Sequence, residues 1–306
     1  MKPIILSKDV FLFKNVLKDP QAATAFIRKE KEIKQDKWFG QWQDWRPWGE
    51  YAKAYPADDD SFLNDTSEGA ELLKECLDVF WDILSVYKKD HLNKEYFDSL
   101  GLSYDFPTSY EELIANRTRP NVWDRWGIAD VVVLESTDTS AEKNLSMEYH
   151  QDRRPWFGGS PHIFNCNIYI NDDYEGGEII FADLETAEKA VTVYDGKELE
   201  YFLIDRPIEY KMEAGDALIF RTDRFHAVKP VKGNKFYIRQ FLSSAWSKDF
   251  VDARDSMDPE DFKEFLKVKE KEGFAAKKFE MRVYENESEI SNVMPGQNIC
   301  VIKPGQ

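Results

Sequence analysis

Two segments of the chain alternate strictly between apolar and polar residues. In the segment 164–171 the even-numbered residues are apolar and the odd-numbered residues are polar. In the segment 235–239 the odd-numbered residues are Lys, Tyr and Arg, and the even-numbered residues are Phe and Ile. Because successive side chains of a strand point to opposite faces, each segment predicts a strand with one apolar and one polar face. The polar faces either meet water, as in an ordinary sandwich, or line the mouth of a barrel.

Shorter apolar runs predict further strands, and apolar residues at helical spacing predict helices. The predicted strands are 10–13, 128–135, 178–181, a hairpin over 191–204 within an insertion at 182–207, 208–212 and 217–220. The predicted helices are 21–33, a core-facing helix at 71–89, a short one at 110–116, and a charged one from Asp258, with Pro259 at its first position, to about Phe279. The chain therefore reads as mixed α and β structure with a sheet-rich middle.

Composition and charge limit the kinds of partner. The 306 residues are 42% hydrophobic, which is enough apolar material for one large core or two small ones. Lys and Arg total 41 against 57 Asp and Glu, a formal net charge of -16. A surface this acidic repels phosphate backbones, so we expect no nucleic-acid partner.

The cysteines and the N-terminus predict a cytoplasmic protein. Cys76, Cys166 and Cys300 are widely spaced and form no CxxC motif, which fits a reducing compartment better than a disulfide-stapled fold. The first nine residues already carry charges, and no run approaches ~18 apolar residues. These features predict neither a signal peptide nor a membrane span.

The candidate chemistry lies in two short segments. His150 and Asp152 are two residues apart, so on an extended strand they project from the same face, and His226 follows 76 residues later. Two imidazoles and one carboxylate on one face of a metal are the ligand set of non-haem Fe(II) oxygenases. The competing interpretation is a chance His-x-Asp triplet whose histidines are only packed or solvated.

Four blocks of sequence carry a family resemblance. Residues 149–152, 167–181, 214–220 and 226–231 resemble the 2-oxoglutarate/Fe(II)-dependent dioxygenases, and within them the prolyl 4-hydroxylase-like branch, in the family's order. The resemblance covers roughly residues 128 to 246. It implies an α+β fold with a double-stranded β-helix core, jelly-roll or cupin-like, and helices packed on the major sheet.

The resemblance also suggests a domain organisation. We expect a single catalytic domain over 1–250, in which 1–127 supplies an N-terminal strand and helical support and 128–246 forms the core. Residues 251–306 are then a C-terminal helix and tail, packed on the core or extending from it.

The family's cofactors imply roles for particular residues. His150, Asp152 and His226 would be the catalytic Fe(II) ligands, with 2-oxoglutarate and O2 as co-substrates and ascorbate as an optional stimulant. The far carboxylate of 2-oxoglutarate pairs with a basic residue after the distal histidine. Lys235 has the spacing of this branch and is preferred, but Arg239 lies on the same face and would form the better bidentate pair.

Other polar residues are candidates for binding the co-substrate or the substrate. Tyr169 matches a family position whose phenol binds the 2-oxoglutarate carboxylate, and Asn167 shares its face. A loop after Asp152 carries two arginines and two aromatic residues and is either a substrate-contacting loop or an ordinary surface turn. The candidate substrate-binding residues are Arg153, Arg154, Trp156, Asn165 and Arg221.

A cluster of four tryptophans has two interpretations. Trp38, Trp42, Trp45 and Trp48 either form a stacking wall for a substrate or pack on a sheet, and packing is the commoner role of buried aromatics.

The predicted reaction is hydroxylation of an unactivated C–H bond, with release of succinate and CO2. Because Asp152 is present, no ligand position is left for chloride, so we expect hydroxylation and not halogenation. A peptidyl proline or another amino-acid side chain is the leading substrate class. The alternatives are a small-molecule oxygenase acting on a free amino acid or natural product, and a metal-free barrel that serves as a binding or structural module.

Overall fold

A computed structural model describes most of the chain. The described residues are 1–7, 10–33, 43–46, 50–54, 64–91, 94, 109, 112, 127–136, 147–150, 152, 162–182, 187–194, 197–205, 208–222, 224–243, 248–271, 281–284 and 298–303.

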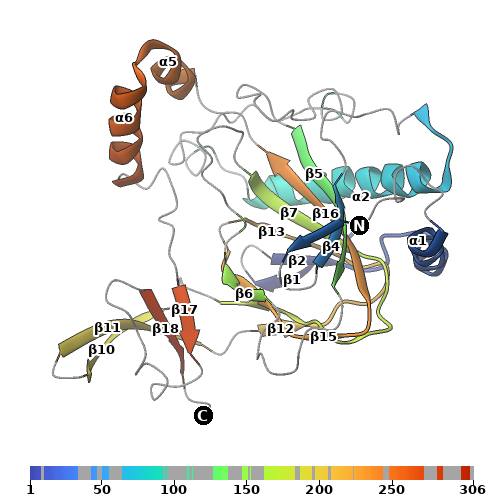
Figure 1. Cartoon of the computed structure of the whole chain (residues 1–306), viewed down its shortest axis with the longest axis horizontal. Helices are drawn as coiled ribbons and strands as arrows, with labels where there is room; N and C mark the ends of the chain where they lie inside the picture. The colour runs from blue at the N-terminus through green and yellow to red at the C-terminus, as the bar shows by residue number, and fades with distance from the viewer. Residues whose placement is uncertain are drawn as a thin grey trace.

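The larger sheet, the major sheet, contains eight antiparallel strands (Figure 1). In spatial order they are β1 (Ile4–Ser7), β2 (Val10–Phe13), β13 (Ala217–Arg221), β7 (His162–Tyr169), β16 (Lys235–Ser243), β5 (Gly127–Ser136), β4 (Glu50–Ala54) and β3 (Gln43–Arg46). The two alternating segments of the sequence, β7 and β16, are neighbours at its centre, with Tyr237 opposite Tyr169 and Arg239 opposite Asn167. Their polar residues therefore share one face of the major sheet.

A second, minor sheet contains four antiparallel strands. In spatial order they are β12 (Ile208–Tyr210), β9 (Ile179–Phe181), β14 (His226–Val228) and β6 (Met147–His150). Two short strands, β8 (Glu175–Gly176) and β15 (Val231–Lys232), pair beside it.

The path of the chain between the two sheets defines the fold. From β5 onward it visits the major, minor and major sheets through β5, β6 and β7, then turns within the minor sheet through β9 and β12 before alternating again through β13, β14 and β16. Eight strands in the orders β13-β7-β16-β5 and β12-β9-β14-β6 form a double-stranded β-helix, one of the jelly-roll architectures. The predicted fold class is confirmed.

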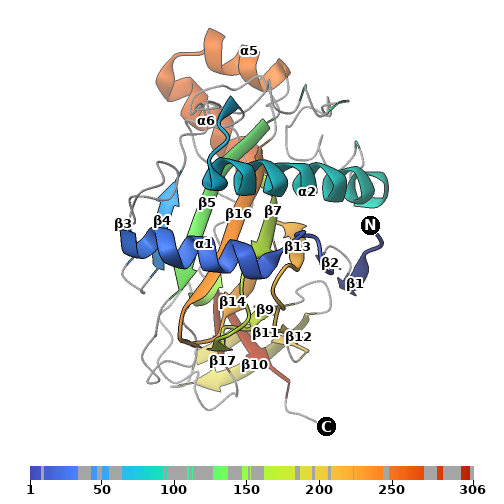
Figure 2. The same cartoon turned by 90° about the vertical axis from the view of Figure 1, so that its right-hand side faces the viewer.

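Two helices cover the outer face of the major sheet. Figure 2 shows α1 (Pro20–Ile33) and α2 (Glu68–His91) lying across β5, β16 and β7. Phe164, Cys166 and Ile168 of β7 belong to the core cluster that these helices complete, together with Phe236 and Ile238 of β16. The helices predicted at 21–33 and 71–89 are both present. Their apolar faces pack against the apolar outer face of the major sheet and bury it.

The polar face of β7 is directed into the protein. Asn165, Asn167 and Tyr169 have exposures of 2%, 5% and 2%. Tyr169 packs with Tyr237, Leu218 and Phe220 in a second cluster, separate from the one under the helices. The interpretation in which the polar faces meet water is therefore wrong, and these residues lie between the two sheets.

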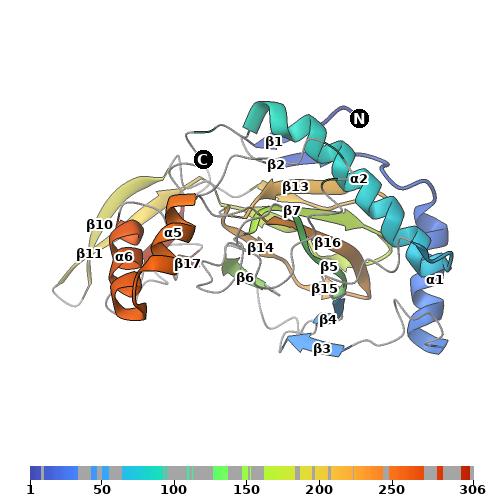
Figure 3. The same ribbon diagram turned by 90° about the horizontal axis from the view of Figure 1, so that it is seen from above.

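An accessory sheet is built from residues far apart in sequence. The predicted hairpin forms β10 (Glu188–Tyr194) and β11 (Lys197–Ile204), and β11 pairs in parallel with β18 (Asn298–Ile302), which pairs in parallel with β17 (Met281–Tyr284). Figures 1 and 3 show this sheet, and the helices α5 (Lys248–Ser256) and α6 (Pro259–Lys271), at the end of the molecule opposite α1. Asp258 begins α6 as predicted, since its Oδ1 accepts hydrogen bonds from the amides of Glu260 and Asp261.

Some predictions differ from the structure or fall outside it. The sequence did not predict β3, β4, α5, β17 or β18. Of the tryptophan cluster, Trp38, Trp42 and Trp48 lie outside the described residues, and only the backbone of Trp45 is described, on β3. The helix predicted at 110–116 also lies outside them, except for position 112. Within the described ranges, no helix combines the length and the apolarity needed to cross a membrane.

Candidate metal centre and co-substrate pocket

The two histidines of the predicted triad lie opposite each other on neighbouring strands of the minor sheet. His226 on β14 is the register partner of His150 on β6, and their ring centroids are 4.3 Å apart. Asp152 lies in a bend just beyond β6, so the strand predicted to carry both His150 and Asp152 ends at the histidine. The bend still brings the carboxylate to the imidazoles, with Asp152 Oδ1 3.5 Å from His150 Nε2 and Asp152 Oδ2 3.4 Å from His226 Nε2.

The spacing of these atoms suits a metal ion better than direct hydrogen bonds. His226 Nδ1 lies 3.0 Å from the carbonyl oxygen of Arg224, which can only accept, so Nδ1 carries the proton and Nε2 presents its lone pair to Asp152. A lone pair facing a carboxylate at 3.4 Å is unfavourable unless a cation lies between them. One ligand atom from each of the three residues lies within 4.8 Å of the others. An octahedral ion with bonds of about 2.1 Å holds adjacent donors about 3 Å apart, close to the observed separations.

Burial and charge set the protonation states of the triad. Burial lowers the pKa of His226 to about 4, and His150 acts in the same direction while Asp152 opposes it. Burial acts to raise the pKa of Asp152, but His226, His150 and Arg239 outweigh it and hold the pKa well below its usual range. At neutral pH, His226 is therefore uncharged and Asp152 is ionised, which are the states that metal ligands require.

Asn165 contacts the candidate metal-binding triad through Asp152. Its Nδ2 donates a 2.6 Å hydrogen bond to Asp152 Oδ2, and its side chain is buried. The sequence placed Asn165 among the substrate-binding candidates; the structure brings it to the carboxylate, where it fixes the orientation of Asp152. The phenyl ring of Phe220 adds an apolar wall, with its centroid 4.9 Å from that of His226.

Lys235 is buried, and three tyrosine rings lie around its Nζ. Its side chain is 3% exposed, and Nζ donates a 2.7 Å hydrogen bond to the carbonyl of Gly177. The ring centroids of Tyr169, Tyr237 and Tyr174 lie 5.3, 5.6 and 5.8 Å from the same Nζ. Burial of an ammonium makes an opposite charge its most favourable additional partner.

The phenol groups of Tyr169 and Tyr174 are kept neutral. Burial raises the pKa of Tyr169 well above its usual range, and a hydrogen bond with Asn167 opposes the shift. Burial also raises the pKa of Tyr174, and its hydroxyl oxygen has no hydrogen-bond partner among the described residues. A neutral phenol can donate a hydrogen bond to an anion.

Sequence reasoning missed Tyr174 and the exact role of Gly177. Gly177 has φ of 69°, and a Cβ there would lie 3.0 Å from Val231, 3.1 Å from Tyr174 and 3.3 Å from Lys235. One feature of the sequence could have identified Tyr174 and Gly177: an aromatic residue and two glycines stand close together in a turn just before a strand of the minor sheet.

Arg239 and Asn167 lie closer to the metal centre. They are register partners, with exposures of 6% and 5%, and the Arg239 guanidinium carbon is 4.7 Å from the centroid of Phe241. The charge of Arg239 contributes to the low pKa of Asp152, which places it on the side of the triad. The buried Oδ1 of Asn167 has no partner in the described part of the chain.

The remaining candidates are only partly covered. Arg221 ends β13 and is half-buried, opposite Phe164 and away from the Lys235 pocket in register. Arg153, Arg154 and Trp156 lie outside the described residues.

Comparisons with known proteins find similar solved structures but no similar curated sequence. No family model and no curated protein sequence matches the chain. A Pseudomonas putida prolyl-4-hydroxylase matches over 77% of this chain and 92% of its own, at 11% identity and a TM-score of 0.42. A viral collagen prolyl hydroxylase from Paramecium Bursaria Chlorella virus-1 matches over 78% and 97%, at 13% identity and a TM-score of 0.41.

A third match has a different substrate class. SnoN, described as a non-heme alpha ketoglutarate dependent epimerase from nogalamycin biosynthesis, matches over 78% of this chain and 81% of its own, at 12% identity and a TM-score of 0.40. Likenesses at these scores do not assign a reaction or a substrate. The functional argument therefore comes from the site itself.

Proposed function

We propose that this protein is an Fe(II)- and 2-oxoglutarate-dependent dioxygenase that hydroxylates an unactivated C–H bond. The observation that carries the proposal is the convergence of His150, Asp152 and His226, with the tautomer of His226 set so that Nε2 faces the carboxylate. Three ligands on one side of an ion leave its other positions open for small molecules.

Different residues of the chain would bind the iron and the 2-oxoglutarate. His150, Asp152 and His226 would hold the iron, and Asn165 fixes the orientation of the carboxylate. Lys235 would pair with the far carboxylate of 2-oxoglutarate, with the Tyr169 and Tyr174 hydroxyls as further donors. The ring of three tyrosines around Lys235 Nζ supports this choice over Arg239, whose charge acts on Asp152.

Bound iron would supply the oxidation chemistry. With 2-oxoglutarate and O2, one oxygen atom would enter the succinate formed as CO2 is released, and the other would enter the substrate as a hydroxyl group. The rings of Phe220 and Phe181, with centroids 4.9 and 6.0 Å from that of His226, would limit water on that side of the reacting centre.

The proposed substrate is a prolyl or other amino-acid side chain in a peptide or protein. This assignment follows the resemblance of the four sequence blocks. A free amino acid or natural product is the other outcome that the experiment below distinguishes.

Two measurements test the proposal. Anaerobic addition of Fe(II) and then 2-oxoglutarate to the wild type should give a weak visible charge-transfer band, and His226→Ala, purified in parallel, should give none. A folded wild-type protein that binds neither Fe(II) nor 2-oxoglutarate would instead be the metal-free binding module.

Substrate class is tested separately by succinate release. Peptide pools, including proline-rich ones, and pools of free amino acids and small metabolites are each incubated with the iron-loaded protein, 2-oxoglutarate and O2. Stimulation by a peptide pool supports the peptidyl substrate. Stimulation by small molecules alone overturns the peptidyl substrate while retaining the dioxygenase.

A further inference from the structure

One buried side chain holds the backbone on both sides of Lys235. Asn171 lies two residues after β7 and is 2% exposed. Its Oδ1 accepts a 2.7 Å hydrogen bond from the amide of Phe236, and its Nδ2 donates a 2.7 Å hydrogen bond to the carbonyl of Asn234. The peptide groups that flank Lys235 are thus bound by the two ends of one carboxamide.

This contact determines the direction of the Lys235 side chain. The carbonyl of Phe236 also accepts a 3.0 Å hydrogen bond from the amide of Ile170, so both polar backbone groups of Phe236 are fixed. The Phe236 ring belongs to the outer core under the helices. Because neighbouring side chains of a strand point to opposite faces, Lys235 must then point between the sheets, where its Nζ reaches the carbonyl of Gly177.

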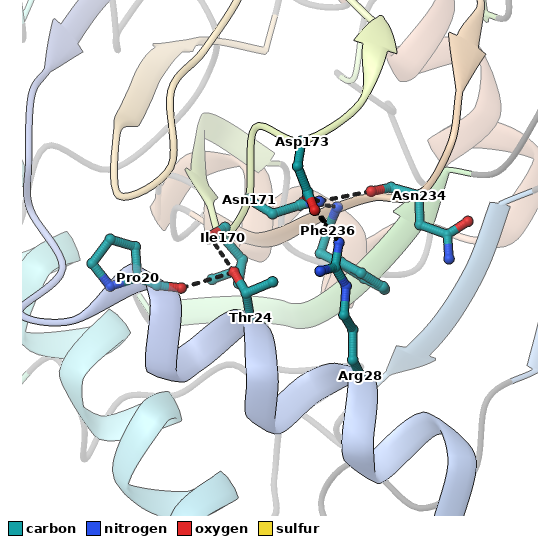
Figure 4. A network of polar contacts seen from close by, with 8 residues as sticks. All are labelled: Pro20, Thr24, Arg28, Ile170, Asn171, Asp173, Asn234 and Phe236. Atoms are coloured by element: carbon teal, nitrogen blue, oxygen red, sulfur yellow. Dashed lines mark hydrogen bonds and ion pairs between the residues drawn. The ribbon is translucent and has the colours of Figure 1, made fainter.

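The Asn171 carboxamide is held in turn from the surface. Its Nδ2 also lies 2.6 Å from Asp173 Oδ1, and the guanidinium of Arg28 on α1 reaches both oxygens of Asp173 at 2.8 and 2.6 Å (Figure 4). The hydrogen bonds from Arg28 and then Asn171 hold the pKa of Asp173 below its usual value. A chain of contacts therefore runs from an exposed helix to the residue beside the pocket.

Figure 4 also contains a contact that does not touch the residues around Lys235. Thr24 Oγ1, on the same helix as Arg28, donates to the carbonyl of Ile170 at 2.9 Å and to that of Pro20 at 2.8 Å. It ties α1 to the end of β7 without reaching Asn234 or the amide of Phe236. Thr24 is therefore a matched control for the loss of one hydrogen bond in the same network.

We propose that Asn171 is a positioning residue for 2-oxoglutarate binding, acting by aiming Lys235 into its tyrosine-lined pocket. The proposal rests on the function proposed above, in which Lys235 is the partner of the far carboxylate. Asn171 contributes no atom to that pocket. Its effect is on the affinity for 2-oxoglutarate, while the triad of His150, Asp152 and His226 is unaffected.

The experiment compares Asn171→Ala with Thr24→Val and Lys235→Ala. The affinity for 2-oxoglutarate is measured by calorimetry on protein loaded with Mn(II), which binds without turnover, and the Mn(II) affinity is measured on each variant first. We expect Asn171→Ala to weaken 2-oxoglutarate binding about tenfold and to raise KM for 2-oxoglutarate with little change in kcat at saturation. Thr24→Val should lower Tm and leave both affinities at the wild-type value.

A second variant covers the case in which Asn171→Ala does not fold. Asp173 is an exposed residue, and Asp173→Ala removes only the outer support of the carboxamide, so we expect a two- to threefold loss of 2-oxoglutarate affinity. Hydrogen exchange at the Phe236 amide should rise in both variants in the absence of ligand.

The outcomes separate the two proposals. If Lys235→Ala weakens 2-oxoglutarate binding but folded Asn171→Ala and Asp173→Ala do not, the positioning role is wrong and the proposed function stands. If Lys235→Ala leaves 2-oxoglutarate binding unchanged, the proposed anchor itself is wrong. Equal losses in Asn171→Ala and Thr24→Val would show a general loss of stability and would also overturn the positioning role.

Discussion

The hydroxyl of Tyr174 should lower the free energy of unfolding of the protein without 2-oxoglutarate. It should also strengthen the binding of 2-oxoglutarate. The side chain is 5% exposed, and its oxygen is buried without a hydrogen-bond partner among the described residues. Its ring centroid lies 5.8 Å from the Nζ of Lys235. A buried hydroxyl that lacks a protein partner costs about 1–3 kcal/mol of desolvation, and that cost is recovered only when an acceptor arrives.

The substitution Tyr174→Phe removes this oxygen and leaves the ring. In the protein without 2-oxoglutarate we expect a gain of about 1 kcal/mol in the free energy of unfolding, which raises Tm by about 2 °C for a chain of this size. With 2-oxoglutarate the same change removes a hydrogen bond to a carboxylate, worth about 1.5–3 kcal/mol. The affinity should therefore fall roughly ten- to a hundredfold.

The assay is thermal unfolding of the Mn(II)-loaded protein with and without 2-oxoglutarate, together with calorimetric titration. Tyr210→Phe is the control, because the Tyr210 hydroxyl makes a 3.3 Å hydrogen bond to the carbonyl of Leu6. That variant should lose stability and keep the wild-type affinity. A Tyr174→Phe protein that is less stable than the wild type and binds 2-oxoglutarate equally well would refute the reasoning.

Four further outcomes are expected. His226→Ala should abolish Mn(II) binding by calorimetry while its circular dichroism and cooperative unfolding persist, and retained metal binding would refute the triad. Asn165→Leu should weaken Mn(II) binding about tenfold, because Asp152 loses its 2.6 Å donor. Gly177→Ala should lower the free energy of unfolding by more than about 1 kcal/mol in urea, since φ is 69° and three side chains crowd the Cβ, whereas Gly233→Ala has its nearest contact at 3.6 Å and should cost less. Metal-free protein should lose stability as pH falls from about 6.5 to about 4, because the unfolded chain takes up a proton at His226 that the folded chain excludes, and His226→Ala should reduce this slope.

Local patterns predicted the strands and helices well where one face is buried. The alternation over 164–171 became β7, with its even-numbered residues in the outer core and Asn165, Asn167 and Tyr169 between the sheets. The Asp258-Pro259 pair began α6 with the expected side-chain hydrogen bonds. These features follow from neighbours in sequence, which is the information that periodicity and capping rules use.

The position of a side chain along the space between the two sheets could not be derived from the alternation of apolar and polar residues. Lys235 and Arg239 lie on the same face of β16, so alternation treats them alike. Their surroundings differ because of the register with β7, which places Tyr237 opposite Tyr169 and Arg239 opposite Asn167. The contact of Asn165 with Asp152 could not be predicted from the sequence either. Asn165 is on the major sheet, whereas Asp152 lies in a bend after β6 of the minor sheet.

Long-range pairing between short strands was likewise beyond the sequence patterns. Strand β18 has five residues, and its partner β11 lies about a hundred positions earlier in the chain. No turn residue or spacing rule connects such segments, because parallel neighbours are joined by long connections. Strands β3 and β4 are antiparallel neighbours in sequence, but the pairing of β4 with β5, which joins them to the major sheet, is also long-range.

The accessory sheet has a direct structural relation to the metal centre. Phe225 and Tyr149, each the residue immediately before a histidine of the triad, contact the cluster that contains Ile204 of β11 and Cys300 of β18. The histidines point inward from β14 and β6, and the preceding aromatic side chains lie against the accessory strands. A fragment ending at residue 250 would lack β18 and would expose Phe225 to water. The inserted hairpin and the C-terminal strand therefore form the support behind two of the three proposed metal ligands, although neither contributes a residue to the triad.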